Sequence, residues 1–494
     1  MQVLWEGIGT GRDYIFGHLF FINLLLAIVI VFFQRKQVQS VWTWLLLLYS
    51  IPILGFVFYL FLGTDMHKQK MFRIKEIEDH LNDAIRNQEY RLQSKGFYEN
   101  APEIAEYEDL IRYNLDISEA VLTDDNDITI YTDGNDKFEA LIEDIRQAKK
   151  YIHIQYYIIK NDVLFNRIKE VLIEKAAEGV EVRILYDGMG CRSVKRSYWQ
   201  QLNSKGIKTS EFFPATLRRL HLRINYRNHR KIVVIDGEKG YVGGFNIGKE
   251  YIGLDEKFGY WRDTHLRIEG AAVASLELRF ILDWNYASRE NLFAPDRYWC
   301  GKVADRLRKE GQHCRVQIVS SGPDSRYQNV RDNYLRMIGK AKQSIYIQTP
   351  YFIPDDAILS ALLIAVHSGI QVNVMIPCKP DHPFVYWATY SYIGDLVMEG
   401  ANCYTYNNGF LHAKGMIVDD KVMCYGTANM DIRSFALNFE VNAIVYDEGK
   451  AIEMRKHFEE DLKYSRQITK NIYVGRSLVI KGKEQMCRLL SPLL

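Results

Sequence analysis

The chain begins with two long apolar stretches, and the polar positions only become frequent after them. Residues 14–33 and 41–62 contain no charged side chain, and each is close to the ~20 residues that an α-helix needs to cross a bilayer. Their apolar positions fall on every helix face, which favours membrane insertion over burial in a protein core. A signal peptide fits poorly, because Glu6 and Asp13 precede the first stretch and a second stretch follows it. We therefore assign residues 1–65 to an N-terminal transmembrane helical hairpin.

Pro52 and Gly55 interrupt the second stretch, so we expect a bent helix and a tilted or shallow hairpin. The turn between the stretches carries two basic residues, whereas more of them flank the outer ends, namely Arg12, Lys68, Lys70, Arg73 and Lys75. Because basic residues tend to stay on the cytoplasmic side of a membrane, we expect a multi-pass protein whose large domain after the hairpin lies in the cytoplasm. Residues 66–125 follow as a charged amphipathic linker, and between residues 71 and 91 we expect a solvated connecting helix.

Beyond residue 125 the same order of elements occurs twice. Apolar, β-branched runs predict strands at 151–157 and 180–186 around a helix at 163–177, and again at 344–348 and 370–376 around a helix at 357–367. The phrase Ala-Lys-x-x-Ile-x-Ile-Gln starts at Ala148 and again at Ala341. Strand–helix–strand units of this kind are typical of parallel sheets covered by helices. We expect an α/β fold with two similar halves, residues 126–315 and 316–494.

Each half carries one copy of a polar motif, His-x-Lys followed by four residues and an Asp, with a small-residue turn and an Asn after it. The copies comprise His229, Lys231, Asp236 and Asn246, and His412, Lys414, Asp419 and Asn429. On a strand, side chains at i and i+2 share a face, so each His lies beside its Lys. An imidazole can attack phosphorus or transfer a proton, and an ammonium can neutralise a phosphate oxygen. One copy alone is weak evidence, but two copies with the same spacing predict a duplicated site.

Composition adds few constraints. A length of 494 residues allows two or three domains, and a formal net charge of +2 gives no reason to expect nucleic acid as a partner. The seven cysteines are scattered without the spacing of a zinc site or a disulfide framework. We expect reduced thiols and neither a metal nor a cofactor.

The paired motifs resemble those of the phospholipase D superfamily. The resemblance implies two α/β halves around a pseudo-twofold axis, with one His from each half facing a single phosphate and no metal. One His would become covalently phosphatidylated while the other acts as acid and base. It also implies supporting roles: Asp263 and Glu440 orient the catalytic His residues, Asn246, Asn429 and Ser434 contact phosphate, and Asp236 and Asp419 brace the motifs. The basic residues before the first motif, including Arg223 and Arg227, either bind an anionic headgroup or form a solvated helix face.

Further features resemble the bacterial cardiolipin synthases: Pro52, Gly55 and Tyr59 in the second apolar stretch, residues 225–229, and the Leu-Leu-Ser-Pro tail from Leu489. This resemblance implies condensation of two phosphatidylglycerol molecules into cardiolipin and glycerol at the bacterial inner membrane, with His229 as nucleophile and His412 as acid and base. Two alternatives stay open, a phospholipase D hydrolase that releases phosphatidic acid and a catalytically idle membrane scaffold. The sequence does not determine the oligomeric state.

Overall fold

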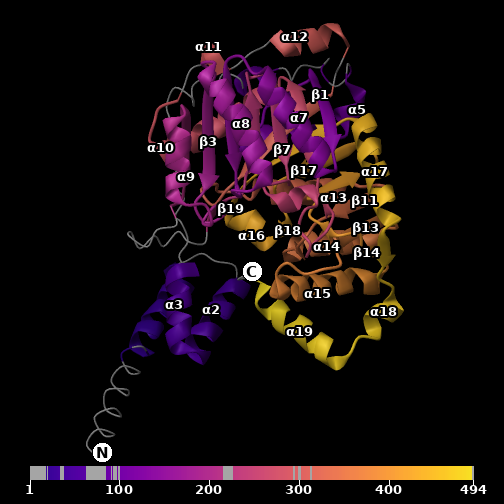
Figure 1. Ribbon diagram of the computed structural model, residues 1–494. Helices are drawn as coiled ribbons and strands as arrows, with labels where there is room; N and C mark the ends of the chain where they lie inside the picture. Colours follow the sequence, from indigo (N-terminus) through magenta and orange to yellow (C-terminus); the bar gives the residue numbers. More distant parts are fainter. Residues whose placement is uncertain are drawn as a thin grey trace, which may run out of the picture.

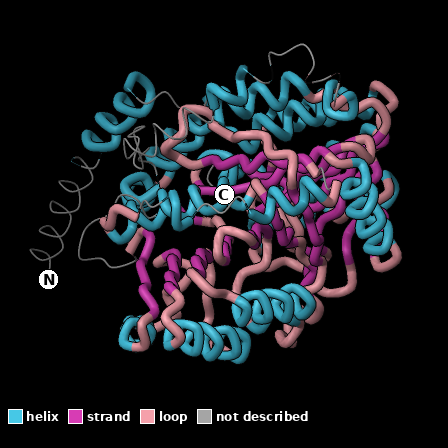
Figure 2. Tube along the Cα trace, turned by 90° about the horizontal axis from the view of Figure 1, so that it is seen from above, coloured by secondary structure: helices cyan, strands magenta, loops and turns pink. Residues whose placement is uncertain are grey.

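Two mixed β-sheets form the centre of the protein, and helices cover their outer sides (Figures 1 and 2). The computed structural model describes residues 18, 20–33, 38–62, 85–90, 92, 97, 99, 101–214, 226–292, 295–298, 302–311 and 314–491.

The first sheet has the strand order β1-β9-β7-β6-β2-β3-β4. Its strands are β1 (Asn126–Tyr131), β2 (Tyr151–Tyr156), β3 (Glu181–Asp187), β4 (Ile207–Phe212), β6 (Ile232–Ile235), β7 (Lys239–Gly243) and β9 (His265–Gly270). The second sheet repeats this order as β10-β19-β17-β16-β11-β13-β14 and adds β20 at its edge. Its strands are β10 (Arg315–Ser321), β11 (Ser344–Gln348), β13 (Gln371–Pro377), β14 (Asn402–Tyr406), β16 (Gly415–Val418), β17 (Val422–Gly426), β19 (Asn438–Tyr446) and β20 (Ser465–Gln467). The chain therefore contains two α/β halves of the same topology.

The predicted strands and helices occur close to their expected positions, but the sheets are not parallel throughout. In each half only three strands run parallel, β2-β3-β4 and β11-β13-β14. The motif strands β6 and β16 pair antiparallel with β2 and β11 and turn directly into β7 and β17. The expectation of parallel sheets was wrong for this part because a tight turn, such as the one after Asp236, can only join antiparallel neighbours.

Side chains of the motif strands alternate between two apolar layers. Ile232 and Val234 of β6 belong to a core shared by both sheets, whereas Val233 and Ile235 belong to the outer core of the first half. In the second half Ile417 points into the shared core. The helices of the outer layers are α7 (Gly134–Gln147), α8 (Val163–Ala177) and α9 (Arg196–Ser204) on one side, and α13 (Asn329–Lys340), α14 (Asp356–His367) and α15 (Pro383–Glu399) on the other. Strand periodicity thus fixes which motif side chains face the other half.

Equivalent local signals bound the helices α8 and α14. Asp162 caps the start of α8 by accepting from Leu164 N and Phe165 N, and Asp355 caps α14 by accepting from Ile358 N. Both helices end before a glycine with positive φ, Gly179 at 88° and Gly369 at 83°. The duplication therefore extends to the caps that position the sheets.

The segment before the first sheet is integrated into the second half. The helices α5 (Pro102–Ala105) and α6 (Glu108–Ser118) pack into the outer core of that half. Residues 85–90 are helical, and Gln88 Nε2 donates to Leu122 O at 2.6 Å. The solvated connecting helix expected between residues 71 and 91 lies largely outside the described residues, and its described end is tied to the body of the protein.

The N-terminal apolar stretches form short helices. Residues 20–28 are helical and continue into the π-helical turn η1 (Val29–Phe33), and the second stretch consists of α2 (Val38–Ser50) and α3 (Pro52–Leu62). The break at Ile51 precedes Pro52, as expected for a residue that cannot donate a backbone hydrogen bond. Among the described residues, no helix combines the length and the apolar character that a membrane span requires. The basic residues used to predict orientation lie outside the described residues.

Short elements and peripheral helices complete the fold. Three two-residue strands pair across the halves, β5 (Arg227–Asn228) with β19, and β8 (Trp261–Arg262) with β15 (Phe410–Leu411). Within the second half β12 (Phe352–Ile353) pairs with β18 (Met430–Asp431). The remaining helices are η2 (Lys249–Ile252), α10 (Val273–Ser288), α11 (Pro295–Tyr298), α12 (Lys302–Lys309), α16 (Ile432–Ala436), α17 (Glu448–Leu462), α18 (Lys470–Val474) and α19 (Leu478–Leu489).

Candidate active site

The two motif histidines line the same cavity, which has a volume of about 510 Å³ and lies between the two halves. Residues from both halves contribute to its wall. Besides His229 and His412, the lining includes Tyr157, Ile158, Arg227, Asn246, Glu250, Tyr251, Phe258, Trp261, Tyr351, Ile353, Asp381, His382, Val385, Asn429, Asp431, Arg433 and Asn438. The duplicated motif therefore forms one site with two imidazoles.

Each histidine is positioned by the backbone of the opposite half. The strand β5 pairs in parallel with β19, and His229 N donates to Phe439 O at 3.0 Å. In the same way β15 pairs in parallel with β8, and His412 N donates to Arg262 O at 2.7 Å. Neither histidine can take its place unless the two halves are docked.

The orienting carboxylates are also exchanged between the halves. Nδ1 of His229 lies 2.9 Å and 3.0 Å from the two carboxylate oxygens of Glu440. Nδ1 of His412 lies 2.5 Å from Asp263 Oδ2. The sequence placed each carboxylate after the motif of its own half, and spacing alone contained no signal that each serves the other histidine. The pairing makes the two halves mutually dependent.

These contacts determine which ring nitrogen meets the substrate. A carboxylate accepts a hydrogen bond, so Nδ1 carries the proton and Nε2 keeps its lone pair. Lys414 Nζ also lies 2.8 Å from His412 Nδ1. Because one ring nitrogen cannot both donate to Asp263 and accept from an ammonium, we assign Nδ1–H to the shorter contact with Asp263. Lys414 then donates to His412 O. Nε2 of each histidine is the atom available for chemistry.

Burial keeps both imidazoles neutral in the free protein. Removal from water is the largest effect and lowers the pKa of His229 to about 4, against the opposing attraction of Glu440. Burial likewise lowers the pKa of His412 to about 4, and Lys414 reinforces the shift. Asp263 and Glu440 are buried as well, yet neighbouring histidines and lysines hold the pKa of both carboxyls below the usual range. At neutral pH the site therefore combines two neutral imidazoles with two carboxylates.

The two motif lysines lie behind the histidines and are fully buried. Lys231 Nζ donates to His229 O at 2.7 Å. Burial lowers the pKa of Lys414 to about 8 and lowers that of Lys231 well below its usual range. An anion bound in the cavity would favour the charged form of both lysines, because an opposite charge offsets the cost of burial.

Asp236 and Asp419 lie at the far ends of β6 and β16, away from the cavity. The carboxylate of Asp236 accepts from the backbone N–H groups of residues 149, 150 and 151 at 2.7–2.9 Å. Asp419 makes the same three contacts to residues 342, 343 and 344 at 2.7–2.8 Å. Both residues tie the motif strand to its neighbour and are too far along the strand to meet the substrate.

The predicted phosphate contacts occupy different places. Asn246 and Asn429 line the cavity, although Asn246 is already engaged, because its Oδ1 accepts from Ile158 N at 3.1 Å and its Nδ2 donates to Tyr251 at 3.0 Å. Ser434 is buried outside the lining, where its backbone N–H donates to Asp431 Oδ1 at 2.6 Å. Arg227 lines the cavity, whereas Arg223 lies outside the described residues.

Further residues line the cavity beside those described above. Arg433 follows the second motif, and burial together with the nearby Arg227 lowers its pKa. The Tyr157 ring lies 5.0 Å from the His229 ring, and Tyr351 hydrogen-bonds Asp381. Tyr157 and Tyr351 follow the repeated Ile-x-Ile-Gln phrase closely, which is a signal that could have identified them. His382 also lies at the cavity wall.

Two buried ion pairs support the strands behind the site. Arg230 Nη1 donates to Asp283 at 2.7 Å, and Gln155 donates to the same carboxylate at 2.6 Å. On the other side Asp461 of the second half is contacted by Gln348 of the same half and by Arg262 of the first half, so this ion pair joins the two halves. A buried charge that loses its partner is costly, so these pairs fix the geometry near each histidine.

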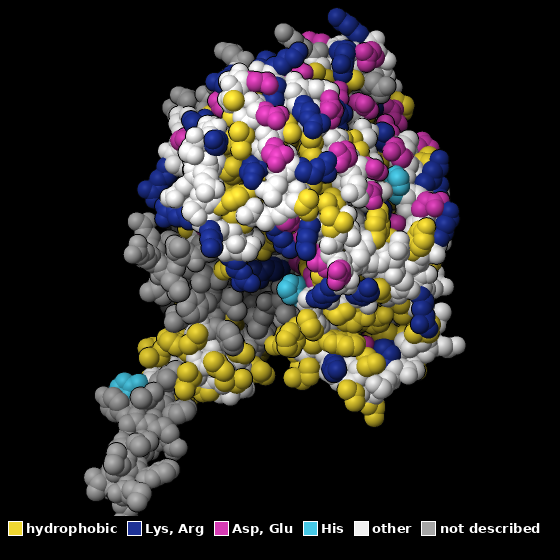
Figure 3. Space-filling model, in the orientation of Figure 1, with side chains coloured by type: hydrophobic (Ala, Val, Ile, Leu, Met, Phe, Trp, Pro, Cys, Tyr) yellow, Lys and Arg dark blue, Asp and Glu magenta, His cyan; other side chains and the backbone are white. Residues whose placement is uncertain are grey.

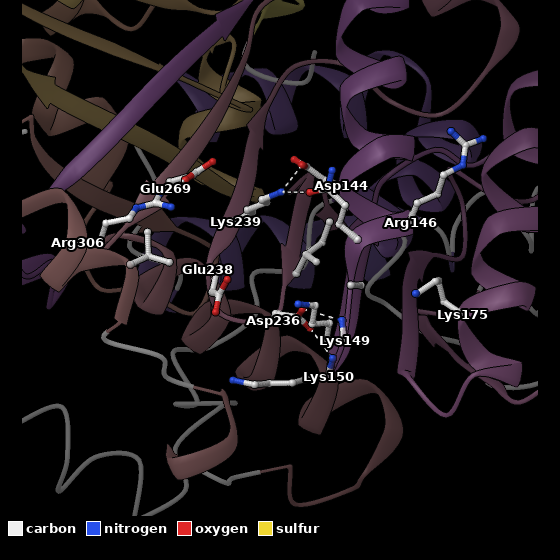
Figure 4. Close-up of a pocket in the computed structure, with 14 residues that line it drawn as sticks. Asp144, Arg146, Lys149, Lys150, Lys175, Asp236, Glu238, Lys239, Glu269 and Arg306 are labelled. Carbon is white, nitrogen blue, oxygen red and sulfur yellow. Dashed lines mark hydrogen bonds and ion pairs between the residues drawn. The ribbon is translucent and has the colours of Figure 1, made fainter. Parts of the chain in front are cut away.

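A second cavity, with a volume of about 790 Å³, lies at the opposite end of β6 (Figure 4). Its charged groups are largely paired: Lys239 contacts Asp144 at 2.5 Å and Arg306 contacts Glu269 at 2.9 Å. Although it is larger, the described residues that line it include no His, Cys, Ser, Thr or Tyr side chain. Within the described ranges, His, Cys, Asp and Glu side chains do not gather in groups of three or more that could hold a metal ion.

Comparison with known proteins identifies the family. The family model described as "Cardiolipin synthase, PLD-like domain" matches residues 141–265 and 334–462. The chain is 48% identical to a cardiolipin synthase of Oceanobacillus iheyensis, over 97% of this chain and 98% of that protein. It is also 48% identical to the major cardiolipin synthase of Bacillus subtilis, over 96% and 98% of the two chains.

Among solved structures, a phosphatidylserine synthase of Haemophilus influenzae matches with a TM-score of 0.57 and 15% identity, covering 74% of this chain and 93% of that one. That likeness concerns the fold. The two-part match to the family model and the nearly full-length identity to its members lead to one conclusion. The chain belongs to the cardiolipin synthase family with phospholipase D-like domains.

Proposed function

We propose that this protein transfers a phosphatidyl group between two phosphatidylglycerol molecules, producing cardiolipin and glycerol. The observation that carries the proposal is the pair of histidines from different halves that line one cavity, each with Nδ1 held by a carboxylate. The relatives named above are cardiolipin synthases, which supports this substrate and product.

In the first step Nε2 of His229 attacks the phosphorus of one phosphatidylglycerol. A P–N bond forms and the bond from phosphorus to the glycerol headgroup oxygen breaks. Protonated His412 gives its Nε2 proton to the departing oxygen, and glycerol leaves. Although the free site favours neutral imidazoles, the bound phosphate adds a negative charge that favours the protonated form of His412.

In the second step neutral His412 takes a proton from a headgroup hydroxyl of a second phosphatidylglycerol. That oxygen attacks phosphorus, the P–N bond breaks, and His229 is released as the neutral imidazole. Two phosphatidylglycerol molecules are consumed, one cardiolipin and one glycerol are formed, and the proton count is balanced. Glu440 and Asp263 stabilise the imidazolium that develops at each stage.

Positive charge around the phosphate supports both transition states. Lys231 and Lys414 are buried behind the histidines, and Arg227 and Arg433 contribute guanidinium groups to the cavity. Where water is excluded, these positive charges stabilise the negative charge that develops on the phosphate oxygens more strongly than they would in solution. We assign Asn429 to the phosphate as well, since its side chain reaches the same cavity.

The N-terminal part is proposed to hold the enzyme at the bilayer. Large apolar side chains on the short helices are exposed, among them Phe32, Trp42 and Leu46. Figure 3 shows apolar side chains gathered over the region of α2 and α3. We propose that residues 1–65 form a bent hairpin in the bacterial inner membrane, with residues 126–315 and 316–494 as cytoplasmic catalytic halves.

The proposal is tested with the purified full chain in vesicles of phosphatidylglycerol, followed by analysis of lipids and free glycerol. We expect cardiolipin and glycerol in equal amounts, with loss of both products in His229→Ala and His412→Ala. The matched control is His367→Ala on α14, an exposed histidine whose loss should leave turnover unchanged. Phosphatidic acid in place of cardiolipin would identify a hydrolase, and absence of turnover would favour a scaffold.

A further inference from the structure

The C-terminal helix α19 presents apolar side chains outward. Leu478 is 84% exposed, and Val479, Met486 and Leu489 are also among the exposed large hydrophobic residues. At 3.6 residues per turn these four side chains share one stripe about 100° wide. We call them the α19 stripe. On the opposite face of the helix Glu484 and Cys487 are buried.

Polar contacts attach this helix to the protein. Glu484 accepts from Arg476 at 2.6 Å, and Arg488 pairs with Asp395 of α15 at 2.7 Å. Beyond the helix end, Ser491 hydrogen-bonds Tyr392 of α15 at 3.0 Å. This distribution is the reverse of that on a surface helix in water, where the apolar face packs inward. An outward apolar stripe indicates an apolar neighbour.

The helix α19 lies at the same end of the protein as α2 and α3 (Figure 1), and apolar side chains gather at that end (Figure 3). The helix α15, against which α19 packs, begins at the catalytic cavity. His382 and Val385 line that cavity, and Phe384 between them is exposed. A surface that contacts the α19 stripe would therefore also lie near the cavity and near the N-terminal apolar helices.

The charge around the stripe favours an anionic neighbour. Lys481 and Lys483 flank it on its two sides, and Lys483 is exposed. From residue 464 to the end of the sequence, Glu484 is the only acidic residue, against Arg466, Lys470, Arg476, Lys481, Lys483 and Arg488. An apolar stripe between basic side chains is typical of helices that lie in the interface of anionic membranes.

We propose that the α19 stripe, together with Phe384, docks into the interfacial layer of an anionic phospholipid bilayer and holds the mouth of the catalytic cavity against it. The inference rests on the proposed function in one respect, because it takes the bilayer that contains the substrate as the partner. The apolar side chains enter the acyl boundary while Lys481 and Lys483 meet lipid phosphates. The enzyme would thus contact the membrane at its N-terminal and its C-terminal helices.

The test uses the full chain with Leu478→Cys or Ile364→Cys, each labelled with the same thiol-reactive fluorophore. Ile364 on α14 is the matched control because it is 67% exposed, as is Val479 of the stripe. Vesicles contain phosphatidylglycerol and a lipid with a nitroxide on its acyl chain. The unsubstituted chain, treated identically, gives the background from native cysteines.

We expect the nitroxide lipid to quench the label at position 478 strongly and the label at position 364 no more than background. Equal quenching at the two positions, or none at either, would overturn the proposal. Protection of position 478 from aqueous iodide without quenching by lipid would also overturn it and would indicate a protein partner, such as a second copy of the chain. Cardiolipin formation is measured separately, so a failure of the proposed function does not alter this result.

Discussion

Asp263 of the first half lies 2.5 Å from Nδ1 of His412 in the second half, and Glu440 of the second half holds His229 of the first. A histidine and its carboxylate are thus assembled only when the halves dock. The arrangement explains why both copies of the motif are complete, since each half supplies the other with an orienting group. It also makes the carboxylates sensitive targets for substitution.

Asp263→Asn is expected to lower kcat by about 10³–10⁴-fold, because an amide no longer fixes the proton on Nδ1 of His412 or stabilises its imidazolium. The measurement is the rate of cardiolipin formation at saturating phosphatidylglycerol, with circular dichroism to verify the fold. Asp136→Asn, at an exposed carboxylate of the same half, serves as control and should retain full activity. A variant with unchanged kcat would show that Asp263 does not orient His412.

Gly244 provides the space that Asp263 occupies. A Cβ atom at position 244 would lie 1.9 Å from Asp263 Oδ1, so Gly244→Ala should displace the carboxylate and reduce kcat in the manner of Asp263→Asn. In the second half the equivalent position is Thr427, whose hydroxyl donates to Glu440 at 2.5 Å. Gly339→Ala is the control, because a Cβ there meets no atom within 4 Å. Equal activity of both variants would contradict this packing argument.

The value of kcat/KM should fall on the acid side only at a pH well below the ordinary pKa of histidine. Protonation of His229 removes the nucleophilic lone pair, and its pKa of about 4 predicts that activity falls as the pH drops through that value, rather than near the ordinary value of about 6.5. On the alkaline side, His412 must still gain the proton that it gives to the leaving group when phosphate binds, and Lys414 loses its charge as the pH rises through about 8, so activity should fall there. An acid limb centred near 6.5 would mean that the free site is more hydrated than the structure indicates.

Arg433→Gln and Arg227→Gln are expected to weaken binding of the anionic lipid more than they slow chemistry. A charge-assisted hydrogen bond contributes about 1.5–3 kcal/mol, which corresponds to an increase of about tenfold or more in KM. The measurement is KM for phosphatidylglycerol diluted in a zwitterionic lipid. Arg146→Gln, at an exposed position of the second cavity, should leave KM unchanged. An unchanged KM in the two cavity variants would remove them from the substrate site.

Local sequence signals predicted much of this structure. Periodicity located the strand β11 and the helix α8 at their observed bounds, because both have strong apolar patterns and α8 also has a capping residue, Asp162. The duplicated spacing also predicted that each His lies beside its Lys, and each Lys does contact its His, although both residues precede the strands β6 and β16 and do not lie on them. These features depend on residues that are close together in the chain.

Relationships between distant segments were not predictable in this way. The exchange of Asp263 and Glu440 depends on how the halves dock, and nothing in the spacing of either motif specifies it. The antiparallel pairing of β6 was missed for the same reason, since pairing partners are a tertiary property. Arg433 and His382 have no periodic signal and reach the cavity only through the fold.

The central claim is that His229 carries the phosphatidyl group while His412 supplies the proton. It is tested most directly with a phosphatidyl ester of p-nitrophenol, whose leaving group needs no proton. Each variant is mixed with this ester and then denatured at alkaline pH. We predict that the His412→Ala variant carries a phosphatidyl adduct on the peptide containing His229. The His229→Ala variant should carry no adduct. An adduct on His412 in His229→Ala, with no adduct in His412→Ala, would contradict the assignment.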